Sequence, residues 1–348
     1  MSNRRLLYAA ERLPVLQNRV FASAEQGRNS PCGDMRLVQD AATGLVFNES
    51  FDPELVVYDH TYNNEQSLSP AFDRHLDDVA GIVRTWLGGR ELLEIGCGKG
   101  AFLRRLAALG CDIAGCDPTY EGSDPKIVRK FYGPHLGFAG RHVILRHVLE
   151  HVPDPVGFLA MIAAANGPGR IYIEVPCFDW ILSRRAWFDI FYEHVNYFRL
   201  ADFTRIFGTV LSAGRLFGGQ YLYAVAELSS VRTPSDGERV DVPADFLATL
   251  DRRPRDAGEV IWGAASKGVI YSLFRQRRGA AVAAAVDVNP AKQGGHLPGT
   301  GLRVLSPEEF RDRIPAGHKV CVMNSNYLAE VRRMTGDRYC YEALDHAA

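Results

Sequence analysis

The sequence lacks the charge bias and the long apolar runs that would indicate a nucleic-acid or membrane partner. Lys and Arg number 40 and Asp and Glu 41, so the formal net charge is −1. A near-neutral chain has no broad basic surface for nucleic acid or for an anionic membrane. No stretch approaches the roughly 20 apolar residues that span a bilayer. The amino terminus has no apolar run behind basic residues, so we expect neither membrane contact nor a signal peptide.

The cysteine patterns of a disulfide framework and of a zinc centre are also missing. The seven cysteines are odd in number, several lie in predicted core strands, and no C-x-x-C pair exists. This usage predicts free thiols in a reducing cytoplasm and no bound metal. The expected partner is a small-molecule substrate, and a homodimer remains possible.

The clearest motif that is present is Glu-Leu-Leu-Glu-Ile-Gly-Cys-Gly-Lys-Gly, from Glu91 to Gly100. It predicts a buried strand, a sharp turn and a helix over 101–109, followed by a strand over 112–116 that ends in Asp117. The turn glycines, which allow the backbone to approach a ligand closely, are Gly96, Gly98 and Gly100. A glycine turn followed by a carboxylate at the end of the next strand is typical of the nucleotide half-site of an open α/β sheet.

Glu94 decides between two ligand classes for this half-site. Dinucleotide enzymes place a pyrophosphate on the helix amino terminus, usually through G-x-G-x-x-G, and a carboxylate there would repel it. Glu94 suits the cationic amino-acid end of S-adenosylmethionine (SAM) instead. The pattern E-x-G-x-G-x-G resembles the first motif of class I SAM-dependent methyltransferases. A nicotinamide-dependent oxidoreductase is the less favoured functional alternative. The structural alternative is a glycine turn that binds no ligand.

The 348 residues exceed one ordinary core, so we expect an α/β chain of two or three domains. Residues 1–68 form a small, irregular N-terminal arm. Residues 69–228 form a Rossmann-like class I methyltransferase domain that begins with an amphipathic helix over 70–87 and is closed by an antiparallel hairpin over 209–227. Residues 243–348 form a second, smaller Rossmann-like domain.

This last part repeats the order of strand, glycine turn, helix, strand and aspartate. A strand over 259–262 leads into the turn Gly263–Gly268 and a helix over 269–275, and a strand over 280–286 ends at Asp287. The glycine pattern is weaker than the first one. Nucleotide binding there therefore stays open, with a degenerate domain as the alternative.

Gly96, Asp117 and polar residues that follow the later strands of the central domain are expected around one crevice. Ligands of open α/β sheets lie beyond the carboxyl ends of the strands. His147, Glu150 and His151 follow the strand predicted over 141–145, and Glu174 lies near the end of the next strand. We expect His147 beside the cofactor and the two glutamates beside the substrate, with structural capping as the alternative for each.

The segment 177–198 interrupts the alternation of predicted strands and helices in the central domain, and it is rich in aromatic residues. We interpret it as an insertion that covers the crevice, although most of its rings are expected to be core. It carries Glu193 and His194, and a histidine titrates near neutral pH, which suits removal of a proton from a methyl acceptor. A buried structural histidine and a solvated surface carboxylate are the alternatives.

Taken together, these motifs resemble those of the C-methyltransferases of deoxysugar pathways. The resemblance covers about residues 70–335 and implies a small N-terminal zinc domain, a central SAM domain and a C-terminal Rossmann-like domain. Four groups of residues carry it: Leu92–Gly100; His147–Pro155; Phe188–Phe198; and Gly263–Gly268 together with Asp287–Gly294, Leu297–Thr300 and Asn324–Tyr327.

Two departures from the family pattern stand out. Cys32 is alone, with Met35 where a second cysteine is expected, so zinc should be absent from the arm. The family's Tyr-His-Glu-His becomes Phe191-Tyr192-Glu193-His194.

The resemblance implies C-methylation of a nucleotide-linked keto-sugar in natural-product biosynthesis. The resemblance and the motifs together assign three groups of residues. The expected catalytic residues are Glu193, His194, His151 and Tyr192. The expected SAM-binding residues are Glu94, Gly96, Gly98, Gly100, Asp117 and His147, and the expected substrate-binding residues are Tyr58, Tyr62, Glu150 and Glu174. The alternative is N-methylation of an amine, amino acid or guanidino compound held by crevice carboxylates.

Overall fold

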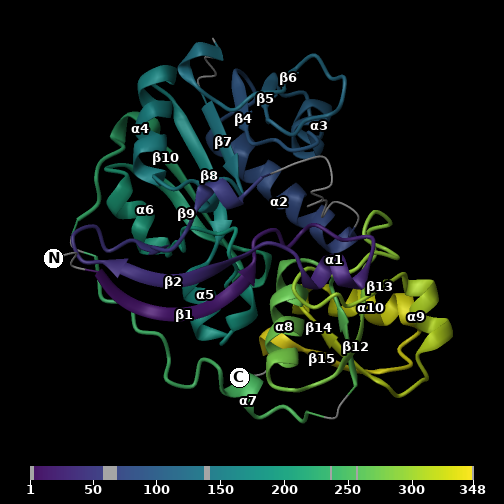
Figure 1. The fold of residues 1–348 in the computed structure, drawn as a ribbon. Coiled ribbons are helices and arrows are strands. Elements are labelled where there is room, and N and C mark those ends of the chain that lie inside the picture. The colour runs from purple at the N-terminus through teal and green to yellow at the C-terminus, as the bar shows by residue number, and fades with distance from the viewer. Residues whose placement is uncertain (1–3, 58–68, 137–141, 236, 256–257, 347–348) are drawn as a thin grey trace.

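The computed structural model describes residues 4–57, 69–136, 142–235, 237–255 and 258–346, and these contain three β-sheets (Figure 1). Tyr58 and Tyr62 lie outside the described residues. No helix in the described part of the chain is long and apolar enough to cross a membrane.

The N-terminal sheet is more regular than the irregular arm that we expected. It is antiparallel in the order β1-β2-β3, and Arg4 lies opposite Asp40. Bulges interrupt the pairing of β1 with β2, so simple alternation of polar and apolar residues is lost. Met35 is fully buried in this sheet. Its elements are β1 (Arg4–Pro14), α1 (Ala24–Arg28), β2 (Cys32–Asp40) and β3 (Val46–Asn48).

The central sheet has seven strands in the order β6-β5-β4-β7-β8-β10-β9. The strands from β6 to β8 are parallel, and β10 runs antiparallel to both β8 and β9. The predicted alternation and the closing hairpin are confirmed. Its strands are β4 (Leu92–Ile95), β5 (Ile113–Cys116), β6 (Ile127–Val128), β7 (His142–Arg146), β8 (Arg170–Pro176), β9 (Val210–Leu216) and β10 (Tyr221–Glu227).

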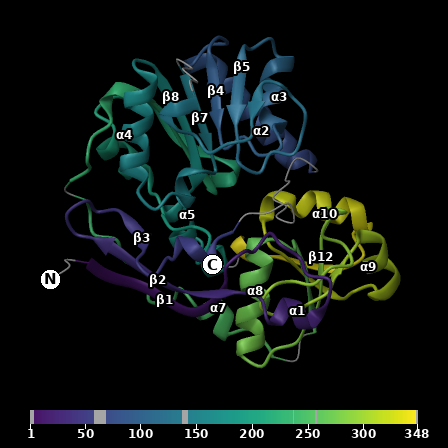
Figure 2. The ribbon, with the colours of Figure 1, turned by 45° about the horizontal axis from the view of Figure 1, so that its top comes forward.

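Helices cover both faces of this sheet (Figures 1 and 2). Side chains of α2 (Pro70–Trp86) and α3 (Ala101–Ala108) share one apolar cluster with the sheet. The opposite face packs against α4 (Pro155–Asn166) and α6 (Leu200–Ile206). Burial of each large apolar side chain stabilises such a face by about 1.5–3 kcal/mol. The side chain of Ser69 caps the first turn of α2.

The C-terminal sheet is entirely parallel, in the order β13-β12-β11-β14-β15. One face packs on α8 and the other on α9 and α10. We did not predict β15, α9 or α10. The elements are α7 (Ala248–Asp251), β11 (Glu259–Trp262), α8 (Ser266–Arg277), β12 (Val282–Val286), β13 (Val304–Leu305), α9 (Pro307–Arg313), β14 (Lys319–Val322), α10 (Leu328–Thr335) and β15 (Cys340–Ala343).

Helix α8 begins three residues earlier than the expected helix. A Cβ on Gly268 would lie 2.0 Å from the carbonyl oxygen of Gly263, so the glycine lets the first helical turn rest directly on the glycine turn. The turn is therefore tighter than the sequence indicates.

The aromatic segment after β8 docks on the N-terminal sheet. It contains α5 (Phe178–Ser183) and continues through a short helical turn at Trp187–Asp189. The amide of Asn48 donates to the carbonyl of Val195 at 2.8 Å, and the amide of Tyr197 donates to the carbonyl of Val46 at 2.9 Å. The segment is thereby held against the edge of β3, immediately after Glu193 and His194.

Candidate active site

The first glycine turn joins β4 to α3. One side of the turn packs against other residues, and the other side is open. Gly96, Gly98 and Gly100 have φ of 73°, 53° and 76°, which favour glycine. A Cβ on Gly96 would lie 2.4 Å from the side chain of Val148, whereas a Cβ on Gly98 would meet nothing within 4 Å. The turn thus packs on the residues after β7 and leaves backbone open to a ligand.

Glu94 lies on β4, two residues before this turn, and is 3% exposed. Its Oε2 has no hydrogen-bond partner among the described residues. Burial raises the pKa of Glu94 to about 8, although the nearby Arg146 lowers it. A neutral, buried carboxyl with an unsatisfied oxygen becomes an ion when a cationic ligand arrives.

Asp117, at the end of β5, fixes the turn in this structure. Its Oδ2 accepts the amide of Gly98 at 2.8 Å, and its Oδ1 accepts the amide of Thr119 at 2.8 Å and the hydroxyl at 2.7 Å. Asp287 repeats the arrangement in the C-terminal sheet, where its carboxylate accepts the amides of Ala264 and Asn289, each at 2.9 Å. Each aspartate therefore braces its own strand–turn–helix unit.

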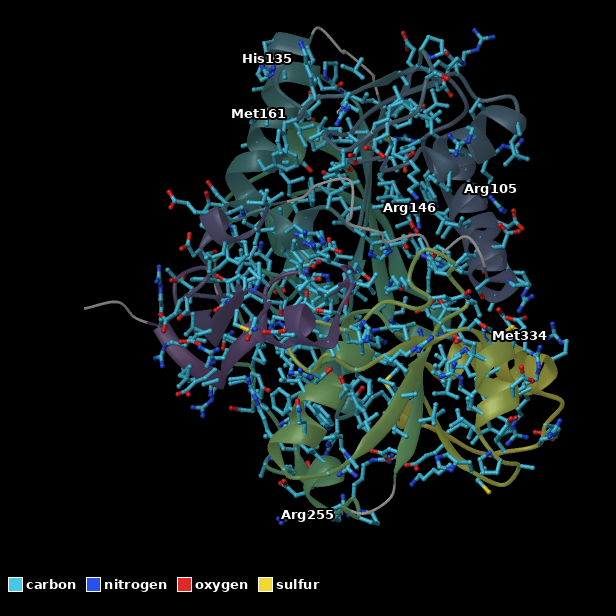
Figure 3. The ribbon with its side chains drawn as sticks, turned by 45° about the vertical axis from the view of Figure 1, so that its right-hand side comes forward. Arg105, His135, Arg146, Met161, Arg255 and Met334 are labelled. Atoms are coloured by element: carbon cyan, nitrogen blue, oxygen red, sulfur yellow. The ribbon has the colours of Figure 1, made fainter. Side chains whose placement is uncertain are left out.

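Glu174 does not reach the site, which corrects the expectation that it binds substrate. It is fully buried on the face of β8 that α2 covers. Its Oε1 is 2.8 Å from Nε2 of His75, its Oε2 accepts the hydroxyl of Tyr172 at 2.8 Å, and Arg146 (labelled in Figure 3) donates to both oxygens. Burial opposes ionisation, but Arg146 and the two neighbouring histidines hold the pKa of Glu174 well below its ordinary value.

His147 is held between two carboxyl groups. Its Nε2 is 3.0 Å from Oε1 of Glu174, and its Nδ1 is 3.4 Å from Oε1 of Glu150. Burial lowers the pKa of His147, but Glu150 and Glu174 outweigh it and raise the pKa to about 9. Its φ of 53° is unusual for a residue with a Cβ. His147 is therefore a fixed cation at the carboxyl end of β7.

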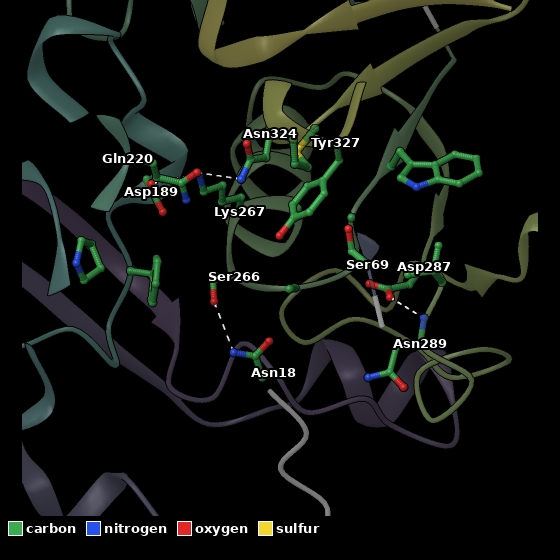
Figure 4. A pocket seen from close by; sticks show the side chains of 18 of the residues that line it. Asn18, Ser69, Asp189, Gln220, Ser266, Lys267, Asp287, Asn289, Asn324 and Tyr327 are labelled. Atoms are coloured by element: carbon green, nitrogen blue, oxygen red, sulfur yellow. Dashed lines mark hydrogen bonds and ion pairs between the residues drawn. The ribbon is translucent and has the colours of Figure 1, made fainter. Parts of the chain in front are cut away.

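A cavity lies where the carboxyl ends of the central and C-terminal sheets face each other (Figure 4). We call it the intersheet cavity. Residues that follow β7 line one end, and Gly263 after β11 and Asn324 after β14 line the other. β11 and β14 are neighbours whose connections leave in opposite directions, and ligands of open sheets bind at such a point.

The structure brings His147, Glu150, His151, Glu193 and His194 to this cavity, whereas Gly96 and Asp117 are not among the residues that line it. The Oε1 of Glu193 accepts the amide of Gln17 at 2.8 Å, and Nδ1 of His151 lies 2.8 Å from the carbonyl oxygen of Glu193. Burial, with the nearby histidines, holds the pKa of His194 well below its ordinary value. His194 is therefore a neutral imidazole in an enclosed site.

Tyr192 is placed away from the cavity, which corrects the expectation that it is catalytic. Its ring stacks on Phe51, and its hydroxyl accepts the amide of Asp52 at 2.8 Å. A Cβ on Gly33 would lie 2.2 Å from the ring of Tyr192. The side chain thus anchors the segment to the N-terminal sheet.

The side of the intersheet cavity at the second glycine turn carries polar residues that we had not assigned. Lys267 in the first turn of α8 forms an ion pair of 3.1 Å with Asp189. The buried Lys292 donates to Oδ1 of Asn18 at 3.1 Å, and Nδ2 of Asn18 reaches Ser266 at 3.5 Å (Figure 4 labels Asn18 and Ser266). The sequence offers no signal for Asn18, because its role depends on a chain segment 248 residues from Ser266.

Comparison with known families finds two matches along the chain. Residues 79–210 match a methyltransferase domain, and residues 238–338 match the C-terminal domain of C-methyltransferases. The chain is 22% identical over 335 residues to the C-methyltransferase NovU of Streptomyces niveus, a match that covers 82% of this chain and 79% of NovU. It is 31% identical over 107 residues to a ubiquinone biosynthesis O-methyltransferase of Aeromonas salmonicida, covering 25% of this chain and 44% of that protein.

Among solved structures, magnesium protoporphyrin IX methyltransferase from Synechocystis PCC 6803 with bound SAH is similar to this chain. The identity is 17% and the TM-score 0.36, and the match covers 45% of this chain and 83% of that one. The plantazolicin methyltransferase BpumL gives 13% identity and a TM-score of 0.37 over 49% of this chain and 87% of that chain.

Proposed function

We propose that this SAM-dependent methyltransferase, whose methyltransferase domain precedes the C-terminal domain of C-methyltransferases, methylates a carbon atom of a nucleotide-linked keto-sugar. One observation carries the proposal: the intersheet cavity runs from His194 to the second glycine turn. A nucleotide held at that turn would present its sugar to the histidine. The proposed place of the reaction is a natural-product pathway.

The residues around the first glycine turn fit SAM, which supplies an electrophilic methyl group on a sulfonium. Glu94 offers a buried carboxyl with an unpartnered oxygen to the amino group. The open backbone at Gly98 allows close approach. Asp117 can accept ribose hydroxyls if it exchanges its bond to Gly98 for them.

The side of the cavity at the second glycine turn fits a diphosphate. α8 begins there, and the amides of a helix amino terminus bind anions. Two cationic side chains, Lys267 and Lys292, line the same region. Trp262 and Tyr327 also line it and offer aromatic surfaces to a base. A free sugar would use none of these groups, so the proposal requires the nucleotide.

His194 is suited to take a proton from the carbon next to the sugar ketone. A general base must be unprotonated, and burial keeps the imidazole neutral. The ring packs on Phe191, with centroids 4.0 Å apart, and this contact orients it. Glu193 holds the amide of Gln17 and thereby fixes the backbone beside the base.

N-methylation of a cationic acceptor is the second candidate, and Glu150 is the observation that favours it. Both carboxylate oxygens of Glu150 are buried without a hydrogen-bond donor among the described residues. The other carboxylates support it less. Glu174 lies outside the cavity, and Oε1 of Glu193 already accepts an amide.

A methyl-transfer screen with labelled SAM separates the two candidates. We expect transfer to nucleotide-linked keto-sugars and none to free sugars, amino acids or guanidino compounds. Transfer only to guanidino compounds would overturn the proposal. Lys267→Ala should raise the KM of the nucleotide-linked acceptor by about tenfold or more, since a charge-assisted contact contributes about 1.5–3 kcal/mol. The exposed Lys130→Ala is the matched control and should leave KM unchanged.

A further inference from the structure

Three side chains in the intersheet cavity form a cluster with the donor set of a metal site. Glu150 and His151 lie on the short helical turn Leu149–His151 after β7, and His194 comes from the aromatic segment. One ligand atom from each lies within 4.8 Å of the others. Two histidines and one carboxylate are a common ligand set for divalent transition metals that keep open positions.

Glu150 supplies an independent observation. It is 1% exposed, and neither carboxylate oxygen accepts a hydrogen bond from the described residues. Its Oε1 forms a long ion pair of 3.4 Å with Nδ1 of His147. A buried carboxylate without a hydrogen-bond donor is costly, and a bound cation would satisfy it.

His151 is oriented as metal-binding histidines usually are. Its Nδ1 lies 2.8 Å from the carbonyl oxygen of Glu193, which can only accept, so this nitrogen carries the proton. Nε2 is then the nitrogen with the lone pair. A backbone carbonyl that fixes the tautomer in this way is the usual outer partner of a ligating imidazole.

Closing on one ion requires the three side chains to move. Four ligands around a tetrahedral ion, with bonds of about 2.0–2.2 Å, lie roughly 3.3–3.6 Å from one another. The three atoms, within 4.8 Å of one another, must therefore approach by up to about 1.5 Å. His194 is attached to a segment fixed at both ends, so rotation of side chains has to supply this movement.

We propose that Glu150, His151 and His194 bind one divalent transition metal ion, of the Zn²⁺ or Co²⁺ class, in the intersheet cavity. The remaining coordination positions face the cavity and take water. We expect this ion to inhibit methyl transfer, and this expectation rests on the proposed function. A metal bound to His194 occupies the lone pair that would accept the proton. The ion therefore blocks methyl transfer and does not assist it.

The test uses the full chain without SAM or acceptor, titrated with Co²⁺ and followed by calorimetry and by visible absorption. Every variant carries Cys340→Ser, because that exposed thiol would itself bind Co²⁺. We expect one Co²⁺ per chain. His194→Ala and the nearly isosteric Glu150→Gln should each weaken binding at least tenfold. His135→Ala removes an exposed histidine, labelled in Figure 3, that does not line the cavity, and should change nothing.

Absence of a stoichiometric site would overturn the proposal, as would equal affinity in all variants, which indicates an adventitious ion only. Circular dichroism and melting temperature identify a variant that fails to fold, and Glu150→Gln then stands as the second test of the site. In the methyl-transfer assay, added Co²⁺ should lower turnover and a chelator should restore it. A chelator that lowers turnover would refute the inhibitory role. If no acceptor is methylated, the proposed function fails, but the metal titration still tests the site because it uses neither SAM nor acceptor.

Discussion

Binding of SAM should release close to one proton at neutral pH, and Glu94 should be its source. Burial raises the pKa of Glu94 to about 8 in the ligand-free protein. At pH 7 a group with that pKa is about 90% protonated, and at pH 9 about 10%. An ammonium group beside the carboxyl favours its ionised form and brings the pKa back down. Binding at pH 7 should therefore expel about 0.9 proton.

Calorimetry in buffers of different ionisation enthalpy measures this release directly. The observed heat should vary between phosphate and Tris with a slope of about 0.9 at pH 7 and about 0.1 at pH 9. Because binding releases protons, the affinity should rise with pH, by nearly tenfold between pH 6 and pH 7, and level off above pH 8.

Glu94→Gln should abolish both the buffer dependence and the pH dependence. It should also weaken SAM binding by about tenfold to a hundredfold, since a charge-assisted hydrogen bond contributes about 1.5–3 kcal/mol. Glu91→Gln makes the same chemical change at an exposed position three residues earlier and should behave as the wild type. Equal heats for the wild type in both buffers would show that Glu94 is already ionised and would refute the reasoning.

Three further predictions concern the turn, the base and its support. Asp117→Ala should weaken SAM binding about tenfold to a hundredfold by calorimetry, and an unchanged Kd would exclude a ribose contact. His194→Ala should lower turnover by about 10²–10⁴ while the Kd of SAM stays the same; normal turnover would remove the histidine from the mechanism. Gly33→Ala should destabilise the fold by about 1–3 kcal/mol, because its Cβ would overlap the ring of Tyr192. Gly81→Ala on α2 meets no atom within 4 Å and should raise the melting temperature instead, so a thermal scan of both variants tests the overlap.

The sequence predicts those parts of the fold whose cause is local. The strand before Gly96, the turn and the next helix follow one another within twenty residues, and their apolar periodicity and glycines are readable without knowledge of the rest. The same holds for α2, whose apolar residues recur at helical spacing. The N-terminal sheet is different. Its strands pair Arg4 with Asp40 across bulges, so no short window contains both the pattern and its partner.

The site shows the same division. A strand-end rule correctly brings His147 and Glu150 to the cavity, because position along a parallel strand fixes the edge of the sheet. The rule does not fix the face. Glu174 lies near the correct edge but on the side that α2 covers, where His75 binds it. Tyr192 adjoins the proposed catalytic pair in sequence, yet its side chain is turned toward Asp52.

Glu193 and His194 lie in a segment that is held by all three parts of the chain at once. The linker after β1 supplies the amide of Gln17 to the carboxylate of Glu193. His151, in the helical turn after β7 of the central part, binds the carbonyl of the same residue. The C-terminal part reaches the segment through α8, in which Lys267 forms an ion pair with Asp189. Each contact joins groups that are far apart in sequence, so the geometry of the pair depends on docking of the whole chain. An acceptor that bridges the intersheet cavity would strengthen this docking as it binds, which couples recognition of its distant end to alignment of the base.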